Sequence, residues 1–217
     1  MPRLKLQRFQ QNAEAPNVIE RGKPLYETIK SRWHTDYFRN DNPIVLELAC
    51  GKGEYTIGLA EACPDKNFIG IDLKGDRIAR GSQQALERGL ANVAFVRTDI
   101  RYLDEFFGEG EIAEIWVTFP DPHPGLKHNK HRLTHPWFLH LYKQLLIPGG
   151  TLHLKTDNRE LFEYSLQTLI DEDFHTLLFT NDLYNSHLYN MHNNINTTYE
   201  TIFYALGFSI NYINCTL

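Results

Sequence analysis

The sequence has 217 residues, of which 42% are apolar, and a formal net charge of −5. This length supports one well-buried core with a small extension and argues against two full domains. The acidic balance argues against a generic nucleic-acid binder, whose binding domain is usually basic. The three cysteines, Cys50, Cys63 and Cys215, lack the spacing of a metal site or a disulfide framework, which favours a reducing compartment.

No apolar run in the sequence approaches the roughly 20 residues that a membrane-spanning helix needs. Residues 1–16 also lack the continuous apolar core of a signal peptide. We therefore expect a cytoplasmic protein that has no membrane partner.

Residues 1–40 show mixed periodicity and predict an arm followed by a helix that packs on the main body. After Pro43, short apolar runs alternate with helical patterns. The runs predict strands at 43–48, 67–73, 92–99, 114–119 and 151–157, and the helical patterns predict helices at 54–63, 74–89, 136–146 and 159–171. The stretch 198–217 predicts a short helix, a turn at Gly207 and a final edge strand. This alternation is typical of a doubly wound, Rossmann-like α/β domain, here residues 41–217, whose parallel sheet is covered on both faces.

The loop after the first predicted strand reads LELACGKGE and contains Gly51 and Gly53. Ligands of doubly wound sheets bind beyond the carboxyl ends of the strands, and two glycines there permit a tight turn and a close backbone approach. Asp72 ends the next strand, where a carboxylate can accept both hydroxyl groups of a ribose. An ordinary strand-to-helix turn is the alternative interpretation of the glycines.

Acidic side chains around this loop decide between possible cofactors. Glu54 stands where a dinucleotide fingerprint needs glycine or alanine, and an acid there repels a pyrophosphate, so a nicotinamide oxidoreductase is the weakest hypothesis. Glu47 and Glu54 suit a cofactor with positive charge, such as S-adenosylmethionine. Asp99, just after the third strand, is placed to accept from the adenine amine, although a carboxylate there also serves as a helix N-cap.

The stretch VTFPDPHPGLKHNKHRL, residues 117–133, ends a strand with Asp121 between two prolines. Prolines cannot extend a strand, so we expect Asp121 on a rigid loop, either at a reaction centre or as a loop-capping carboxylate. No acidic residue occurs between Asp121 and Asp157, and that interval holds five Lys or Arg residues and six of the ten histidines. Its field can attract an anion, although a solvated helix face is equally consistent. We expect no metal there, because the histidine spacings fit no common site.

Aromatic residues in the second half of the chain have two possible roles. Trp137, Phe138 and Tyr142 have helical spacing and are predicted to be core residues rather than base-stacking platforms. Tyr199 lies in a polar stretch and either stacks on a base or covers the sheet.

With these motifs read, the sequence resembles the tRNA (guanine-N7)-methyltransferase family from about Pro43 to the C-terminus. The segments that carry the resemblance are ELACGKGE, FPDP followed by KHNKHRL, LHLKTDN and TTYE. The resemblance implies a class I methyltransferase fold with seven strands, mostly parallel with an antiparallel last strand. It also implies S-adenosylmethionine as methyl donor and N7 of guanine 46 in the variable loop of tRNA as acceptor.

The resemblance also implies a role for individual positions. Cofactor contacts are expected from Glu47, Gly51, Gly53, Asp72, Asp99 and Asp121, and Asp121 is expected at the reaction centre. Substrate contacts are expected from Gly125, Lys127, Lys130, Arg132, Asp157, Thr197, Thr198, Tyr199 and Glu200.

Two positions depart from the family's pattern. The family commonly has Trp-x-Lys after FPDP, where this chain has His123, Pro124 and Gly125, and Thr198 replaces a basic residue. Lys127 is the expected substitute for the missing charge. The departures leave two alternatives open, a methyltransferase acting on another RNA or a small molecule, and a catalytically silent RNA-binding relative. The sequence is compatible with a monomer or a homodimer.

Overall fold

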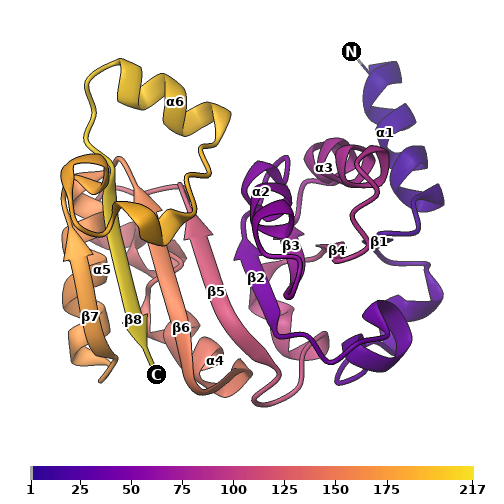
Figure 1. The fold of residues 1–217 in the computed structure, drawn as a ribbon, viewed down its shortest axis with the longest axis horizontal. Helices are drawn as coiled ribbons and strands as arrows, with labels where there is room; N and C mark the ends of the chain where they lie inside the picture. Colours follow the sequence, from indigo (N-terminus) through magenta and orange to yellow (C-terminus); the bar gives the residue numbers. More distant parts are fainter. Residues whose placement is uncertain (1) are drawn as a thin grey trace.

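The computed structural model describes residues 2–217, with side chains from Leu4 onward. Its centre is an eight-stranded sheet in the order β1-β4-β3-β2-β5-β6-β8-β7 (Figure 1). All strands run in one direction except β8, which is antiparallel to both of its neighbours. The strands are β1 (Val18–Ile19), β2 (Ile44–Leu48), β3 (Asn67–Asp72), β4 (Val93–Arg97), β5 (Ile112–Thr118), β6 (Leu146–Thr156), β7 (His175–Thr180) and β8 (Asn211–Thr216).

This arrangement confirms the predicted fold class, a mostly parallel α/β sheet with an antiparallel last strand. The sheet has one strand more than the resemblance implies. The described part of the chain includes β1, a two-residue strand that pairs with β4 and is too short to leave a periodic signal in the sequence.

Helices cover both faces of the sheet, as the alternation of elements predicts. Alternate residues of β2 point to opposite faces, so Ile44 and Leu46 join one hydrophobic cluster and Val45 joins another. The first cluster packs against α4 and α5, and the second packs against α2 and α3. The helices are α1 (Pro2–Glu14), α2 (Glu54–Ala62), α3 (Gly75–Glu87), α4 (Pro136–Leu145), α5 (Arg159–Asp171) and α6 (Thr198–Ala205).

The N-terminal region differs from the predicted order of arm and helix, because helix α1 comes first. It packs against α3, where the Asn12 amide donates to the Gly75 carbonyl at 2.7 Å. The segment that follows is anchored by Trp33, which is fully buried and donates its indole N–H to the Phe106 carbonyl at 2.9 Å. A helix that gains its stability from tertiary packing gives a weak local signal.

The C-terminal strand is not at the edge of the sheet, so that part of the prediction is wrong. Strand β8 inserts between β6 and β7, and all its residues but the last are buried. The edge is β7, which the sequence analysis did not predict and whose side chains are mostly exposed. An exposed edge strand lacks the apolar periodicity that identifies a buried one.

One of the three predicted core aromatics is also placed differently. Phe138 and Tyr142 are buried in α4, but Trp137 is 49% exposed. Positions 138, 139, 141, 142 and 145 form the buried face of the helix, and position 137 lies just outside the edge of that face.

Candidate functional site

The central part of the sheet contains a topological switch point between β2 and β5. Strand β3, which follows β2 in the chain, pairs with one edge of β2, and β5 pairs with the other edge. The order of the strands therefore reverses between β2 and β5. Ligands of such sheets bind beyond the carboxyl ends of the strands at this point. A cavity of about 400 Å³ lies there, within the usual size range of small-molecule sites. Its walls come from most of residues 47–54, from Arg77, from Thr118 and Phe119, and from four residues of 197–202.

Glu47 lines the cavity but is only 3% exposed. One of its carboxylate oxygens accepts from the backbone N–H of Thr56 at 2.8 Å and from the hydroxyl of the same residue, and the other accepts from the Thr118 hydroxyl at 2.7 Å. Burial raises the pKa of Glu47 to about 7, against the opposing effect of these hydrogen bonds. The carboxyl group therefore titrates near neutrality, and a cationic neighbour favours its ionised form.

The glycine loop lies directly beside Asp72. Gly51 and Gly53 both have positive φ, and a Cβ at Gly53 would lie 2.5 Å from the ring of Phe95, so the turn requires glycine there. Asp72 accepts from the Gly51 N–H at 2.8 Å and from the Lys74 N–H at 2.7 Å. The carboxylate thus joins the ends of β2 and β3, and its remaining lone pairs can still accept hydroxyl groups.

Asp99 lies at the end of β4 but is not among the residues that line the cavity. It caps the short helix Ile100–Glu105, accepting from the Arg101 N–H at 3.0 Å, and it pairs with the Arg101 guanidinium at 2.7 Å. The hydrogen bond from the Arg101 side chain is the largest cause of a lowered pKa for Asp99. The structure therefore shows the capping role that the sequence analysis left open, and a contact with adenine stays a prediction.

The FPDP segment leaves β5 at the rim of the cavity. Phe119 lines the cavity with positive φ (48°), which is uncommon for a residue other than glycine, and its N–H donates to the Lys155 carbonyl at 2.8 Å. Asp121 follows on an irregular, exposed stretch between Pro120 and Pro122. The two prolines and the fixed turn at Phe119 restrict the positions that the carboxylate can take.

Arg132 lies inside the FPDP loop, although the sequence analysis expects it to contact substrate. Its side chain is 2% exposed, and it donates to the carbonyls of Pro122 at 3.0 Å and His123 at 3.2 Å. It also forms an ion pair with Glu160 and lies 4.5 Å from the ring centre of Tyr164. The guanidinium therefore braces the backbone on the C-terminal side of Asp121, with no exposed face for a phosphate.

The rest of the basic stretch is exposed. Lys127 and Lys130 lie on the short helix Leu126–His131, which begins after Gly125, and both side chains face solvent. The ring of His131 lies 5.5 Å from that of His123 and partial burial lowers the pKa of His123. Within residues 2–217, no group of three or more His, Cys, Asp or Glu side chains is arranged to hold a metal ion.

The first turn of α6 forms the opposite wall of the cavity. Thr197 caps the helix in a capping box with Glu200, and Thr198 donates its N–H at 2.6 Å and its hydroxyl at 2.8 Å to Glu54. Tyr199 is 44% exposed, and its hydroxyl lies 3.4 Å from the carboxylate of Asp157. The structure thus brings the predicted substrate positions 197–199 to the cavity, and Asp157 lies beside them in contact with Tyr199, although their roles stay predictions.

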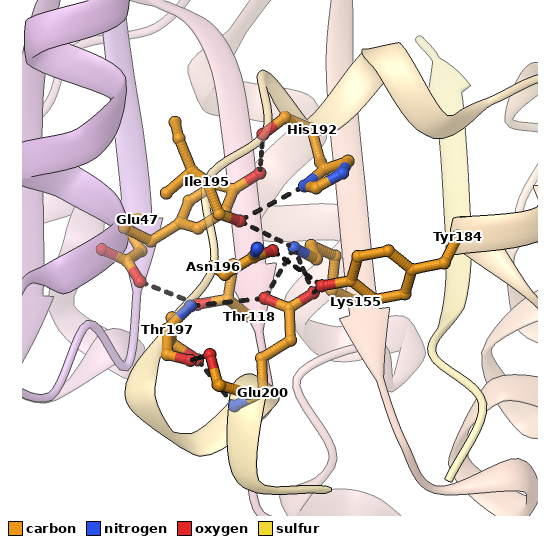
Figure 2. Close-up of polar contacts among 11 residues, drawn as sticks. Glu47, Thr118, Lys155, Tyr184, His192, Ile195, Asn196, Thr197 and Glu200 are labelled. Carbon is orange, nitrogen blue, oxygen red and sulfur yellow. Dashed lines mark hydrogen bonds and ion pairs between the residues drawn. The ribbon is translucent and has the colours of Figure 1, made fainter. Parts of the chain in front are cut away.

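Glu200 is the member of this set whose side chain does not line the cavity. It is fully buried and forms an ion pair with Lys155 at 2.8 Å (Figure 2). Burial lowers the pKa of Lys155, and Glu200 opposes that shift. In the sequence Lys155 is only one member of a basic interval, because nothing near it in the chain indicates a partner 45 residues away.

Similar solved structures identify the class of protein that this fold and site define. The crystal structure of the 16S rRNA methyltransferase KamB superposes with a TM-score of 0.64 at 13% identity, over 93% of this chain and 98% of that chain. An antibiotic-related methyltransferase superposes with a TM-score of 0.62 at 15% identity, over 84% of this chain and 91% of that chain. A family model described as "Putative methyltransferase" matches residues 41–211. The fold is that of a class I methyltransferase.

Relatives of higher identity define the family. A protein of Cytophaga hutchinsonii named tRNA (guanine-N(7)-)-methyltransferase is 46% identical over 215 residues, which are 98% of this chain and 97% of the relative. One of Listeria monocytogenes with the same name is 41% identical over 85% of this chain and 84% of its own. The chain belongs to the tRNA (guanine-N7)-methyltransferase family, as the sequence resemblance indicated.

No helix in the described part of the chain is long and apolar enough to cross a membrane.

Proposed function

We propose that this protein transfers a methyl group from S-adenosylmethionine to N7 of guanine 46 in the variable loop of tRNA. The observation that carries the proposal is the cavity at the switch point, with buried Glu47 on its inner wall and the braced FPDP loop at its rim. It occurs in a chain that is 46% identical over nearly its full length to a protein named tRNA (guanine-N(7)-)-methyltransferase.

The cavity fits a methyl donor that is a cationic nucleoside. Glu47 and Glu54 line it with negative charge, the loop at Gly51 and Gly53 leaves backbone free for close approach, and Asp72 is suited to ribose hydroxyls. When bound, the donor supplies a methyl group already activated by the positive charge on sulfur. The chain's own task is to orient this group toward the rim.

Methylation of guanine N7 requires little acid–base chemistry from the protein. N7 carries an in-plane lone pair and no proton near neutrality, so no strong general base is needed. Alignment of the nucleophile with the methyl group is then the main source of catalysis, and it supplies on the order of 7–11 kcal/mol in well-oriented reactions. Asp121 stabilises the positive charge that develops on the purine, or accepts from the guanine N1–H and amino group to hold the base.

The exposed surface next to the rim supplies contacts for RNA. Lys127 and Lys130 bind phosphates, which gives salt-dependent and largely sequence-independent affinity. Tyr199 stacks on Phe203 with a centroid distance of 4.2 Å and offers an exposed ring edge beside the cavity to an unstacked base. Arg132 is assigned to bracing the loop rather than to a phosphate, because it is buried.

The test is methyl transfer to a defined tRNA transcript. The protein is incubated with S-adenosylmethionine labelled in the methyl group and with two transcripts, one with G46 and one with A46. Label that enters only the G46 transcript, at a base sensitive to cleavage specific for 7-methylguanosine, supports the proposal. Label at another nucleotide, or none in either transcript while the donor still binds, overturns it in favour of another substrate or a silent relative.

A matched variant assigns the chemistry to the site. Asp121→Ala should abolish transfer, whereas Asp65→Ala should not, because Asp65 is an exposed aspartate in the turn before β3, at the other end of the strands.

A further inference from the structure

Lys155, near the carboxyl end of β6, is fully buried, which is rare for lysine unless it is paired. Its ammonium group lies 2.8 Å from Glu200, whose side chain is also 0% exposed. Figure 2 shows the two side chains converging between β6 and the start of α6. Burying both charges costs free energy that their attraction offsets only in a good geometry, so the pair strongly favours one arrangement of the two elements.

Further hydrogen bonds hold the start of α6 and the residues just before it. The Lys155 ammonium donates to the Ile195 carbonyl at 3.3 Å. The Tyr184 hydroxyl lies 3.0 Å from the Glu200 carboxylate and 2.7 Å from the Asn196 side-chain oxygen. The segment 195–200 is therefore held against the sheet by polar contacts that meet at Lys155 and Glu200 (Figure 2).

Apolar burial does little to hold helix α6 in place. It has eight residues, and isolated helices of that length are marginal in water. Its apolar side chains are largely exposed, among them Ile202 (52%), Tyr204 (45%) and Leu206 (67%) just beyond its end. Polar contacts at its first turn, which are the buried ion pair of Glu200 and the hydrogen bonds from Thr198 to Glu54, therefore set its position rather than apolar burial along its length.

We propose that Lys155 and Glu200 are a positioning pair for the methyl donor, which hold the first turn of α6 as one wall of the cavity. Thr197, Thr198 and Tyr199 line the cavity and directly precede Glu200, so any displacement of Glu200 moves that wall. The inference rests on the proposed function only for the identity of the donor.

The pair also sets the charge beside the cavity. The Lys155 ammonium lies 5.9 Å from the ring centre of Phe119, which lines the cavity. Without Glu200, Glu47 is the remaining carboxylate that acts on this ammonium, and the added positive charge beside the cavity disfavours a cationic donor. Loss of Glu200 alone therefore weakens donor binding more than loss of Lys155 alone.

The test compares Lys155→Met, Glu200→Gln and the double variant with the wild type. Calorimetry measures binding of S-adenosylmethionine, hydrogen exchange measures the order of residues 195–205, and thermal unfolding measures global stability. The control is the double variant Lys66→Met/Glu114→Gln, which removes a partly buried ion pair at the amino-terminal end of the strands. The double variant at 155 and 200 leaves no unpaired buried charge, so it keeps the test possible where a single variant fails to fold.

We expect the double variant to regain much of the melting temperature that the single variants lose. Its dissociation constant for the donor should stay about tenfold above that of the wild type, because the cavity wall is no longer preorganised. The Michaelis constant for the donor should rise more than kcat falls, and exchange should accelerate in residues 195–205. The control should leave the donor dissociation constant, the Michaelis constant and the exchange of residues 195–205 unchanged. Wild-type donor affinity and exchange in the double variant would overturn the proposal. If the wild type itself takes up no donor, the proposed function fails, and the exchange data alone decide the positioning role.

Discussion

Thr118 donates its hydroxyl to the carboxylate of Glu47 at 2.7 Å, and this bond joins β5 to β2 across the switch point of the sheet. The same carboxylate accepts two hydrogen bonds from Thr56 in α2. Glu47 is thereby fixed in a single orientation below the cavity, with its negative charge kept from bulk water. Such a preorganised charge stabilises a bound cation more than a charge on a mobile surface side chain does.

Removal of this charge should weaken donor binding. Glu47→Gln keeps the size of the side chain, its amide oxygen can still accept from Thr56, and its NH2 group can donate to the Thr118 hydroxyl. We therefore expect a folded protein whose dissociation constant for S-adenosylmethionine is raised about tenfold or more. Isothermal titration calorimetry measures the change, and Asp65→Asn serves as a control at the other end of the strands. Unchanged affinity in Glu47→Gln would remove this residue from the donor site.

Donor affinity should also depend on pH. The pKa of Glu47 is about 7, raised mainly by burial, and the nearby charged or titratable groups are Asp72, Cys50 and Lys155. A cationic donor favours the ionised carboxylate, so binding releases a proton below that pKa. Affinity should therefore rise with pH, by at most about tenfold per unit, and level off above about pH 7. Calorimetric titrations between pH 5.5 and 8.5 measure this slope, which Glu47→Gln should remove.

Asp121 is predicted to act on the purine rather than on folding. Because it is exposed on its loop, Asp121→Asn should leave the melting temperature unchanged. Loss of the negative charge should lower kcat by about 100-fold or more, the usual cost of removing a group that stabilises developing charge. Single-turnover transfer to a tRNA transcript measures this, and near-normal turnover would refute the assignment.

The exposed lysines are predicted to bind phosphates. Lys127→Ala and Lys130→Ala should each weaken tRNA binding and reduce the slope of log affinity against log salt concentration by about 0.7–0.9. Filter binding across a salt series measures the slope. Lys30→Ala, an exposed lysine in the N-terminal region, is the control and should leave it unchanged.

Arg132 should behave differently from these lysines. Arg132→Met removes the brace on the carbonyls of Pro122 and His123, so kcat should fall as the Asp121 loop loosens, together with a lower melting temperature. The salt dependence of tRNA binding should stay as in the wild type. A reduced salt slope in Arg132→Met would instead assign Arg132 to the RNA surface, as the sequence resemblance implies.

The sequence by itself determined the architecture from residue 43 to residue 171 and the position of the site. Apolar periodicity, glycine turns and proline stops act over a few residues, so the local chain contains the signal. The rule that ligands bind beyond the strand ends then directed attention to Glu47, the glycine loop and Asp72, and these residues lie together in the structure.

Only the tertiary structure decided which charged side chains face the cavity and which face one another. Arg132 and Glu200 look equally available for substrate in the sequence, but one braces a loop and the other pairs with Lys155 in the interior. The insertion of β8 between β6 and β7 was settled in the same way. The physical reason is that burial of a charge or pairing of a strand depends on which distant segment packs against it, and that partner has no counterpart in the local pattern.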